Sequence, residues 1–270
     1  MKIISSIAAT RTDLPIDGVR GFPLSNLAGL YLFDGTDSTS NIKNWAPAGG
    51  TTATAFGGDS LDAVSLLTNG GINIKATANI PGPTVDWTAP WSAIWQGRVN
   101  QPTNPAGAAP WTSMFIGCEQ TTTRGMIVYQ TVGTSYPTST TPVTATIRQS
   151  VNATQGGVTG GPSAPGLVYT SMVTCCLRFD GNVTADAIFM RGGTIVSTIS
   201  KTDVNKTGMV TNASSVVQTN MKHTAGSASV SYTRGDLSLE GFTVYTEYVT
   251  NAKLSVIDQA LSAIRAARGR

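Results

Sequence analysis

Short apolar segments separated by turn residues fill most of this chain, and this pattern constrains the fold more than any other feature. Segments 27–33 and 92–99 have the length of β-strands, and Asp34-Gly35, a strong turn dipeptide, follows the first of them. Turns recur about every 8–15 residues, a spacing typical of antiparallel sandwiches rather than of βαβ units. We therefore predict an all-β protein.

The composition supports this prediction and excludes several other classes. Charged residues make up 12% of the 270 residues, against roughly 25% in an average soluble domain. The 29 Gly and 13 Pro, with abundant Thr and Ser, favour turns and strands over long helices. The net charge of +3 is small and scattered, so we expect no nucleic-acid partner. No apolar run approaches the roughly 18 residues of a membrane span, so we expect no membrane insertion.

The turn signals divide the chain into a series of expected strands. Gln155 to Gly166 is rich in Gly and Pro and is expected to be a long loop. Arg191-Gly192-Gly193 is a hairpin signature between two strands. Besides 27–33 and 92–99, we expect strands at 72–74, 113–116, 125–130, 144–149, 167–179, 185–190, 194–199, 229–232 and 239–248.

The two ends of the chain differ from this pattern. Residues 1–25 lack clean periodicity and contain Pro and Gly, so we expect an extended N-terminal arm followed by one domain, 26–270. Near the C-terminus, apolar residues recur at helical spacing, and Thr250 or Asn251 can cap the start of a helix. The apolar face of this helix either packs on the edge of the domain or forms an oligomer contact. Its residues are Leu254, Ile257, Leu261 and Ile264.

The cysteines and the histidine provide little reactive chemistry. An odd number of cysteines, Cys118, Cys175 and Cys176, cannot form a closed set of disulfides. Cys175 and Cys176 point to opposite faces of a strand, so we interpret them as small packed residues rather than a redox or metal pair. The single histidine, His223, is interpreted as an exposed turn residue. We expect neither a metal site nor a catalytic residue.

Four stretches share a common order with a known fold: 30–35 with Asn44-Trp45, 90–99, 177–181 with 187–194, and 239–245 with Leu254-Ser255. Taken in this order, they resemble the concanavalin A-like lectin and glucanase superfamily in its laminin G-like and pentraxin-like form. The resemblance covers about Leu27 to Leu261 and implies a two-sheet antiparallel jelly roll in which each sheet buries one face. Arg191-Gly192-Gly193 departs from the asparagine-glycine turn of that family.

Members of that superfamily include glycan hydrolases and calcium-binding lectins, so the resemblance implies both chemistries as alternatives. Hydrolysis needs two carboxylates facing each other across the sugar, and Glu119, Glu240 and Glu247 do not form the alternating acidic motif of such glycanases. Asp34 to Ser38 and Asp59 to Asp62 are interpreted as turns, with Ca²⁺ binding as the alternative. We expect no cofactor.

Sugar binding requires an exposed aromatic face beside polar groups. Trp91 and Trp95 share a strand face with Ala93 and are expected in the core. Trp45 and Trp111 lie beside Pro- and Gly-containing loops and are the candidate carbohydrate-binding residues. The alternative is that these two side chains are buried loop anchors.

Three functions follow from these observations. The first is a non-enzymatic structural protein of a virus, a bacteriophage in particular. It would serve in capsid decoration or as a tail-fibre module, and would dock through its arm and its sandwich surface to other virion subunits or to itself. The second is a carbohydrate-binding adhesin or lectin domain with a host surface glycan as partner. The third is a glycoside hydrolase. The first hypothesis places the protein in the virion, as an oligomer.

Overall fold

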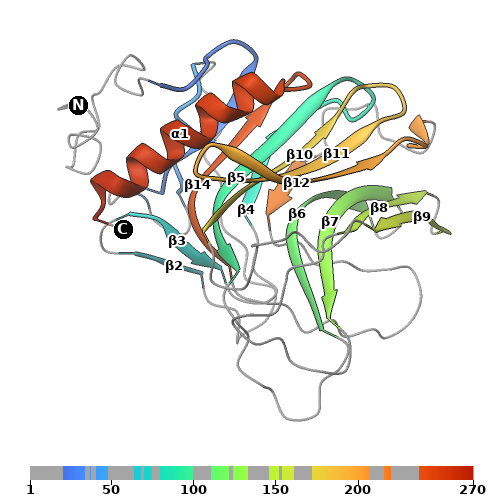
Figure 1. The fold of residues 1–270 in the computed structure, drawn as a ribbon, viewed down its shortest axis with the longest axis horizontal. Coiled ribbons are helices and arrows are strands. Elements are labelled where there is room, and N and C mark those ends of the chain that lie inside the picture. The colour runs from blue at the N-terminus through green and yellow to red at the C-terminus, as the bar shows by residue number, and fades with distance from the viewer. Residues whose placement is uncertain are drawn as a thin grey trace.

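A computed structural model shows two antiparallel sheets stacked face to face, with one helix on the outer side of the larger sheet (Figure 1). The predicted all-β sandwich with a short C-terminal helix is confirmed. The structure describes residues 21–33, 37, 41–47, 64–67, 70–74, 80–99, 111–121, 124–132, 146–151, 154–160, 172–206, 216–219 and 237–269.

Within these ranges, one sheet has eight strands and the other has six. The eight-stranded sheet has the order β12-β11-β10-β5-β14-β3-β2, and β1 also pairs with β14. The six-stranded sheet has the order β4-β13-β6-β7-β8-β9. The strands are β1 (Leu27–Tyr31), β2 (Val64–Leu66), β3 (Ile72–Ile74), β4 (Ile80–Thr84), β5 (Trp91–Val99), β6 (Trp111–Thr121), β7 (Arg124–Val132), β8 (Thr146–Val151), β9 (Thr154–Gly160), β10 (Val173–Phe179), β11 (Ala185–Arg191), β12 (Thr194–Lys201), β13 (Val216–Thr219) and β14 (Leu237–Tyr245).

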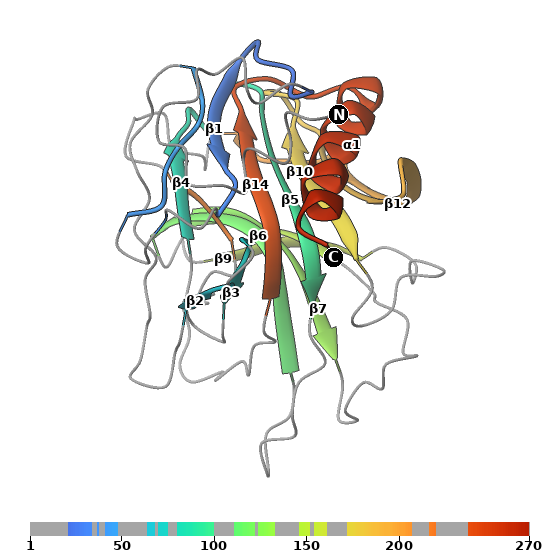
Figure 2. The same ribbon diagram turned by 90° about the vertical axis from the view of Figure 1, so that its left-hand side faces the viewer.

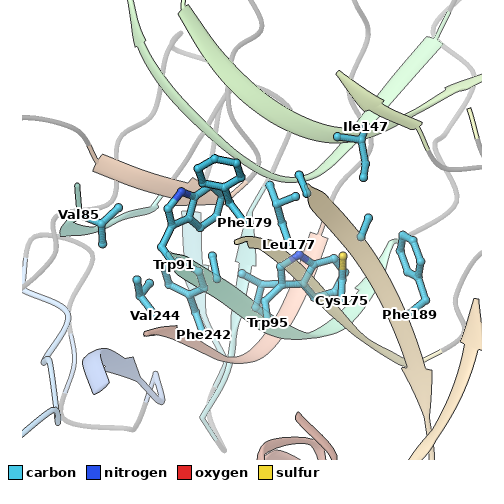
Figure 3. Close-up of a cluster of buried hydrophobic side chains, with 14 of the residues drawn as sticks. Val85, Trp91, Trp95, Ile147, Cys175, Leu177, Phe179, Phe189, Phe242 and Val244 are labelled. Atoms are coloured by element: carbon cyan, nitrogen blue, oxygen red, sulfur yellow. The ribbon is translucent and has the colours of Figure 1, made fainter. Parts of the chain in front are cut away.

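The central strands of the eight-stranded sheet are buried on both faces. One face packs toward the six-stranded sheet and forms an inner core around Trp91, Trp95, Leu177, Phe179 and Phe242, most of which Figure 3 shows pointing into the same space. The other face forms a helix-side core, which includes Ile94, Cys176 and Ile188. The expectation that each sheet buries only one face is therefore wrong for this sheet, because α1 covers its outer side.

Cys175 and Cys176 illustrate this double burial. Cys175 belongs to the inner core and Cys176 to the helix-side core, so the predicted opposite orientation is confirmed. Both thiols are free and fully buried, and burial raises the pKa of Cys176 to about 12. They are therefore unreactive packing residues, as expected.

The C-terminal helix α1 (Asn251–Ala267) crosses the outer side of the eight-stranded sheet, alongside β5 and β14 (Figure 2). Thr250 is its N-cap, and its side chain accepts a hydrogen bond from Lys253 N. The four predicted apolar residues, Leu254, Ile257, Leu261 and Ile264, are buried, but over the sheet face rather than at the domain edge. Within the described ranges, no helix is both long and apolar enough to cross a membrane.

The predicted hairpin around Arg191-Gly192-Gly193 is confirmed, because β11 pairs with β12. The expected strands at 113–116 and 125–130 lie in β6 and β7, which also pair with each other. Gly192 and Gly193 connect β11 to β12 with φ values of 57° and 80°. Two consecutive residues with positive φ are what a tight two-residue hairpin turn requires, and glycine adopts this conformation without strain.

The glycine-rich segment predicted as a loop, 155–166, contains a strand. β9 pairs with β8 at the edge of the six-stranded sheet, where a strand needs only one partner. β4 contains Pro81 and Pro83 and was not predicted as a strand. It lies at the opposite edge, where a missing N–H costs no ladder hydrogen bond on the open side. Strands β2 and β13 were not predicted.

The predicted arm, 1–25, is described only from residue 21. Phe22 is buried in the helix-side core, next to residues of α1. Residues 1–20, His223 and the predicted strand at 229–232 lie outside the described residues. The proposed boundary between arm and domain stays a prediction.

Candidate functional site

A pocket with a volume of ≈ 310 Å³ opens between α1 and the eight-stranded sheet. It adjoins one end of the helix-side core, where the facing side chains change from apolar to polar. Its polar lining includes Gln96 from β5, Thr174 from β10, and Asp258, Ser262 and Arg265 from α1. Met172, Met190 and Gly192 complete much of the wall.

The local sequence places these side chains by periodicity. Gln96 is two residues beyond Ile94 on β5, and Thr174 is two residues before Cys176 on β10, so both point toward α1. Gln96 and Thr174 are direct partners across the two strands. On α1, positions 258, 262 and 265 follow the spacing i, i+4, i+7 and share one stripe of the helix.

Asp258 is the centre of the polar network. It is 2% exposed, and its two oxygens accept hydrogen bonds from three different elements. Oδ1 accepts from Thr174 Oγ1 and from Gln96 Nε2, the latter at 3.2 Å, and Oδ2 accepts from the Gly193 N–H at 2.7 Å. The carboxylate thereby links α1 to β5, β10 and the β11–β12 turn, and each of its oxygens is already engaged.

The side-chain oxygen of Gln96, Oε1, has no hydrogen-bond partner. Its Nε2 lies 2.9 Å from Ser262 Oγ and 3.2 Å from Asp258 Oδ1. A carboxylate can only accept, so this contact requires the amide nitrogen on that side and leaves Oε1 on the other. Oε1 is buried and has no hydrogen-bond partner. A buried unpaired acceptor of this kind costs roughly 1–3 kcal/mol unless a donor reaches it.

Arg265 presents a second unpaired group at the same pocket. Its Nε is buried without an acceptor, although the side chain as a whole is half-buried. Arg265 is also the basic residue in the last turn of α1, where the helix dipole favours a positive charge. The dipole explains the charge at this position but provides no acceptor for Nε.

A second polar cluster on the same sheet face has a structural role. Asp186 Oδ2 accepts from Arg178 Nη2 at 3.0 Å and from the Tyr248 hydroxyl, and Oδ1 accepts from Ser200 at 2.6 Å. Arg178 Nη1 donates to the Val249 carbonyl at 2.5 Å. These bonds connect β10, β11 and β12 to the segment before α1. Among the described residues, no side chain of this second cluster has a buried polar atom without a hydrogen-bond partner.

The predicted sugar-binding residues lie away from the pocket. Trp45 is 7% exposed, and Lys43 Nζ lies 3.7 Å from the centre of its ring. This placement fits the buried-anchor alternative, in which the ring face is covered. Trp111 begins β6, and its side chain lies outside the described part of the structure. The binding role of both residues stays untested.

The acidic residues that the sequence offered for catalysis or Ca²⁺ binding have other partners, where the structure describes them. Glu240 pairs with Arg268, and Glu247 pairs with Lys253. Asp37 Oδ1 accepts from the Lys43 N–H at 2.8 Å, as expected of a turn residue. Asp34, Asp59 and Asp62 lie outside the described residues, and the described ones contain no cluster of three or more His, Cys, Asp or Glu suited to a metal ion.

Sequence reasoning missed the pocket because it searched for aromatic residues on loops. The available signal was polarity at buried positions. Gln96 and Thr174 interrupt apolar strands, and Asp258 directly follows Ile257 on the buried side of the helix. Only the packing of α1 on the sheet shows that these three residues meet.

Comparison with known proteins identifies the fold. No family model and no curated protein matches this sequence. Solved structures of botulinum neurotoxin binding domains do match. A structure of type C, the neurotoxin whose cell entry depends on two ganglioside molecules, superposes with a TM-score of 0.56 at 8% identity. The serotype G binding domain superposes with a TM-score of 0.54 at 12% identity. A DC binding domain in complex with rat synaptotagmin II gives 0.56 at 8%.

These matches cover 87–88% of this chain but only 51–52% of the neighbours. The chain therefore spans about half the length of the proteins that it resembles. At such low identity the likeness is one of fold. It supports the lectin-like sandwich expected from the sequence.

Proposed function

We propose that this protein is a non-enzymatic carbohydrate-binding module of the adhesin type, and that the pocket beside α1 holds the sugar. Among its structural neighbours, botulinum neurotoxin type C enters cells by interaction with two ganglioside molecules, and a DC binding domain forms a complex with rat synaptotagmin II. These neighbours support a receptor-binding role for this fold. The virion role expected from the sequence has no such support, and placement on a virion stays an untested proposal.

The unpaired Oε1 of Gln96 is the observation that carries the proposal. A sugar hydroxyl can donate to this acceptor, while other ring oxygens can accept from the pocket's donors. The wall of Met172 and Met190 supplies apolar surface for the C–H face of a sugar ring. The volume is near the lower end of the range for ligand pockets, which suits one sugar residue of a longer glycan.

A binding role fits the pocket better than hydrolysis. Glycoside hydrolysis uses two carboxyl groups on opposite sides of the scissile bond. The described lining of the pocket contains one, Asp258, and both of its oxygens already accept hydrogen bonds. We therefore propose that the protein binds and releases the sugar without hydrolysing it.

A glycan array with the full chain, followed by calorimetric titration, tests the proposal. We expect Gln96→Met to abolish binding, since it keeps the volume but removes the acceptor. Gln149→Met is the matched control: Gln149 is also buried, but both of its amide atoms bond to the Asn205 backbone, far from the pocket. Ser262→Leu, which fills the pocket from a half-buried position, provides a second variant in case Gln96→Met is unstable.

Binding that survives both Gln96→Met and Ser262→Leu would place the sugar elsewhere and overturn the pocket assignment. Failure of the wild-type protein to bind any glycan on the array would overturn the proposed function itself.

A further inference from the structure

We propose that the pocket selects a sugar that carries a carboxylate, with Arg265 as the residue that recognises it. This inference rests on the proposed carbohydrate-binding function. It follows from the unpaired hydrogen-bonding atoms around the pocket rather than from its shape.

Two side chains of opposite charge, Asp258 and Arg265, line the pocket without pairing with each other. Both carboxylate oxygens of Asp258 accept hydrogen bonds, from Gln96, Thr174 and the Gly193 N–H. None of the ion pairs found among the described residues joins Asp258 to Arg265. The guanidinium of Arg265 thus has no carboxylate partner within the described lining.

Arg265 is suited to a carboxylate by its geometry. A guanidinium presents Nε and Nη donors as a planar fork that matches the two oxygens of a carboxylate. Here Nε is buried and has no acceptor. A neutral hydroxyl would supply one acceptor, whereas a carboxylate supplies two and also neutralises the charge.

The two unpaired atoms therefore call for different ligand groups. Gln96 Oε1 requires a donor, which a ring hydroxyl provides, and Arg265 Nε requires an acceptor, which a carboxylate provides. An acidic sugar carries both groups on one ring. A hydrogen bond to a charged group contributes about 1.5–3 kcal/mol, which corresponds to roughly a tenfold to hundredfold preference in affinity.

The test compares matched pairs of sugars by calorimetric titration of the full chain. Glucuronic acid and glucose differ only in the carboxylate, and sialyllactose and lactose differ by one acidic residue. We expect the acidic member of at least one pair to bind ten times more tightly or better. Arg265→Gln should abolish this preference while weak binding of the neutral sugar persists. Lys206→Gln removes the same charge from an exposed position near Gly181 and should retain the preference.

The outcomes separate this inference from the proposed function. Equal affinity for acidic and neutral sugars, both lost in Gln96→Met, would overturn the carboxylate preference and leave the sugar-binding pocket intact. An acidic preference that persists in Arg265→Gln would overturn the role of Arg265. A sulfated sugar that binds while the carboxylated one does not would overturn the choice of anion. Absence of binding to every sugar would overturn both proposals.

Discussion

Asp258 shows how one residue can connect several parts of this protein. Its carboxylate accepts hydrogen bonds from Gln96, Thr174 and Gly193, which belong to two strands and a turn. The carboxylate is almost fully buried, so each bond replaces one that the donors would otherwise make to water. Without it, the Thr174 hydroxyl and the Gly193 N–H lose this acceptor, while Gln96 Nε2 keeps Ser262 Oγ.

We therefore predict that Asp258→Ala lowers the free energy of unfolding by about 3 kcal/mol, because unpaired buried donors cost roughly 1–3 kcal/mol each and partial relaxation recovers some of the loss. Urea denaturation measures the change. Gln259→Ala, at the exposed neighbouring position of α1, should change stability by less than about 0.5 kcal/mol. Equal effects of the two substitutions would contradict the role assigned to Asp258.

Tyr248 gives the protein a predictable response to alkaline pH. Burial, and then its hydrogen bond to Asp186, raise the pKa of Tyr248 to about 12, from the ordinary value of 10. Between these two values the folded protein keeps the phenol proton while the unfolded chain releases it. Stability from this residue is therefore complete below pH 10 and is lost as the pH rises toward 12.

Tyr248→Phe should flatten this decline. Burial also raises the pKa of Tyr31 and Tyr245, so wild type and variant share those contributions. The free energy of unfolding, measured at several pH values across the window, should fall less steeply in the variant. Identical slopes would show that the Tyr248 proton does not distinguish the folded from the unfolded state.

At the scale of single elements, α1 is held by its contact with the sheet. The Thr250 cap supplies local stability, but the main contribution comes from burying its apolar face. Gly241 on β14 makes this close packing feasible, because a Cβ at that position would lie 2.5 Å from Leu261 Cδ2. The helix and the sheet therefore depend on each other's sequence.

Leu261→Ala should lower the free energy of unfolding by about 2–5 kcal/mol through the cavity that it leaves under the helix. Val256→Ala is the matched control, since Val256 lies on the same helix but is 43% exposed. It should have a small effect, measurable by the same denaturation experiment. A loss in Leu261→Ala no greater than in the control would mean that α1 is only loosely attached.

At the scale of the whole molecule, the C-terminus closes the three-layer arrangement of helix and two sheets. Arg268 caps α1 and turns inward, where Nη1 donates to Glu240 Oε2 at 3.2 Å and to the Glu240 carbonyl at 2.9 Å. Nη2 donates to the Leu32 carbonyl at the end of β1. Both partners of the ion pair are almost fully buried, so loss of Arg268 leaves Glu240 with an uncompensated charge.

Two truncations test this arrangement. A chain that ends at Arg268 should retain the stability of the full protein. A chain that ends at Ala267 should lose about 3–5 kcal/mol, the usual cost of breaking a buried ion pair. Thermal and urea denaturation compare them directly. Equal stability of the two truncated chains would mean that the Arg268 contacts do not contribute to the fold.

By itself, the sequence determined the local structure of this protein. Alternating apolar residues, tight turns such as Gly192-Gly193 and the helical spacing from Leu254 to Ile264 each depend on neighbours within a few residues. These signals predicted the all-β class, most central strands and the helix. Edge strands such as β9 were missed because they need only one partner and tolerate glycine.

Only the tertiary structure decided which surfaces meet. α1 covers the outer face of the sheet and so brings Asp258 next to Gln96 and Thr174. These contacts join residues far apart in the sequence: Asp258 is 84 positions from Thr174 and 162 positions from Gln96. A sequence pattern records which face of an element is apolar but not which other element will cover it. The candidate pocket is a product of that second choice, because its unpaired atoms lie where the apolar contact between helix and sheet ends.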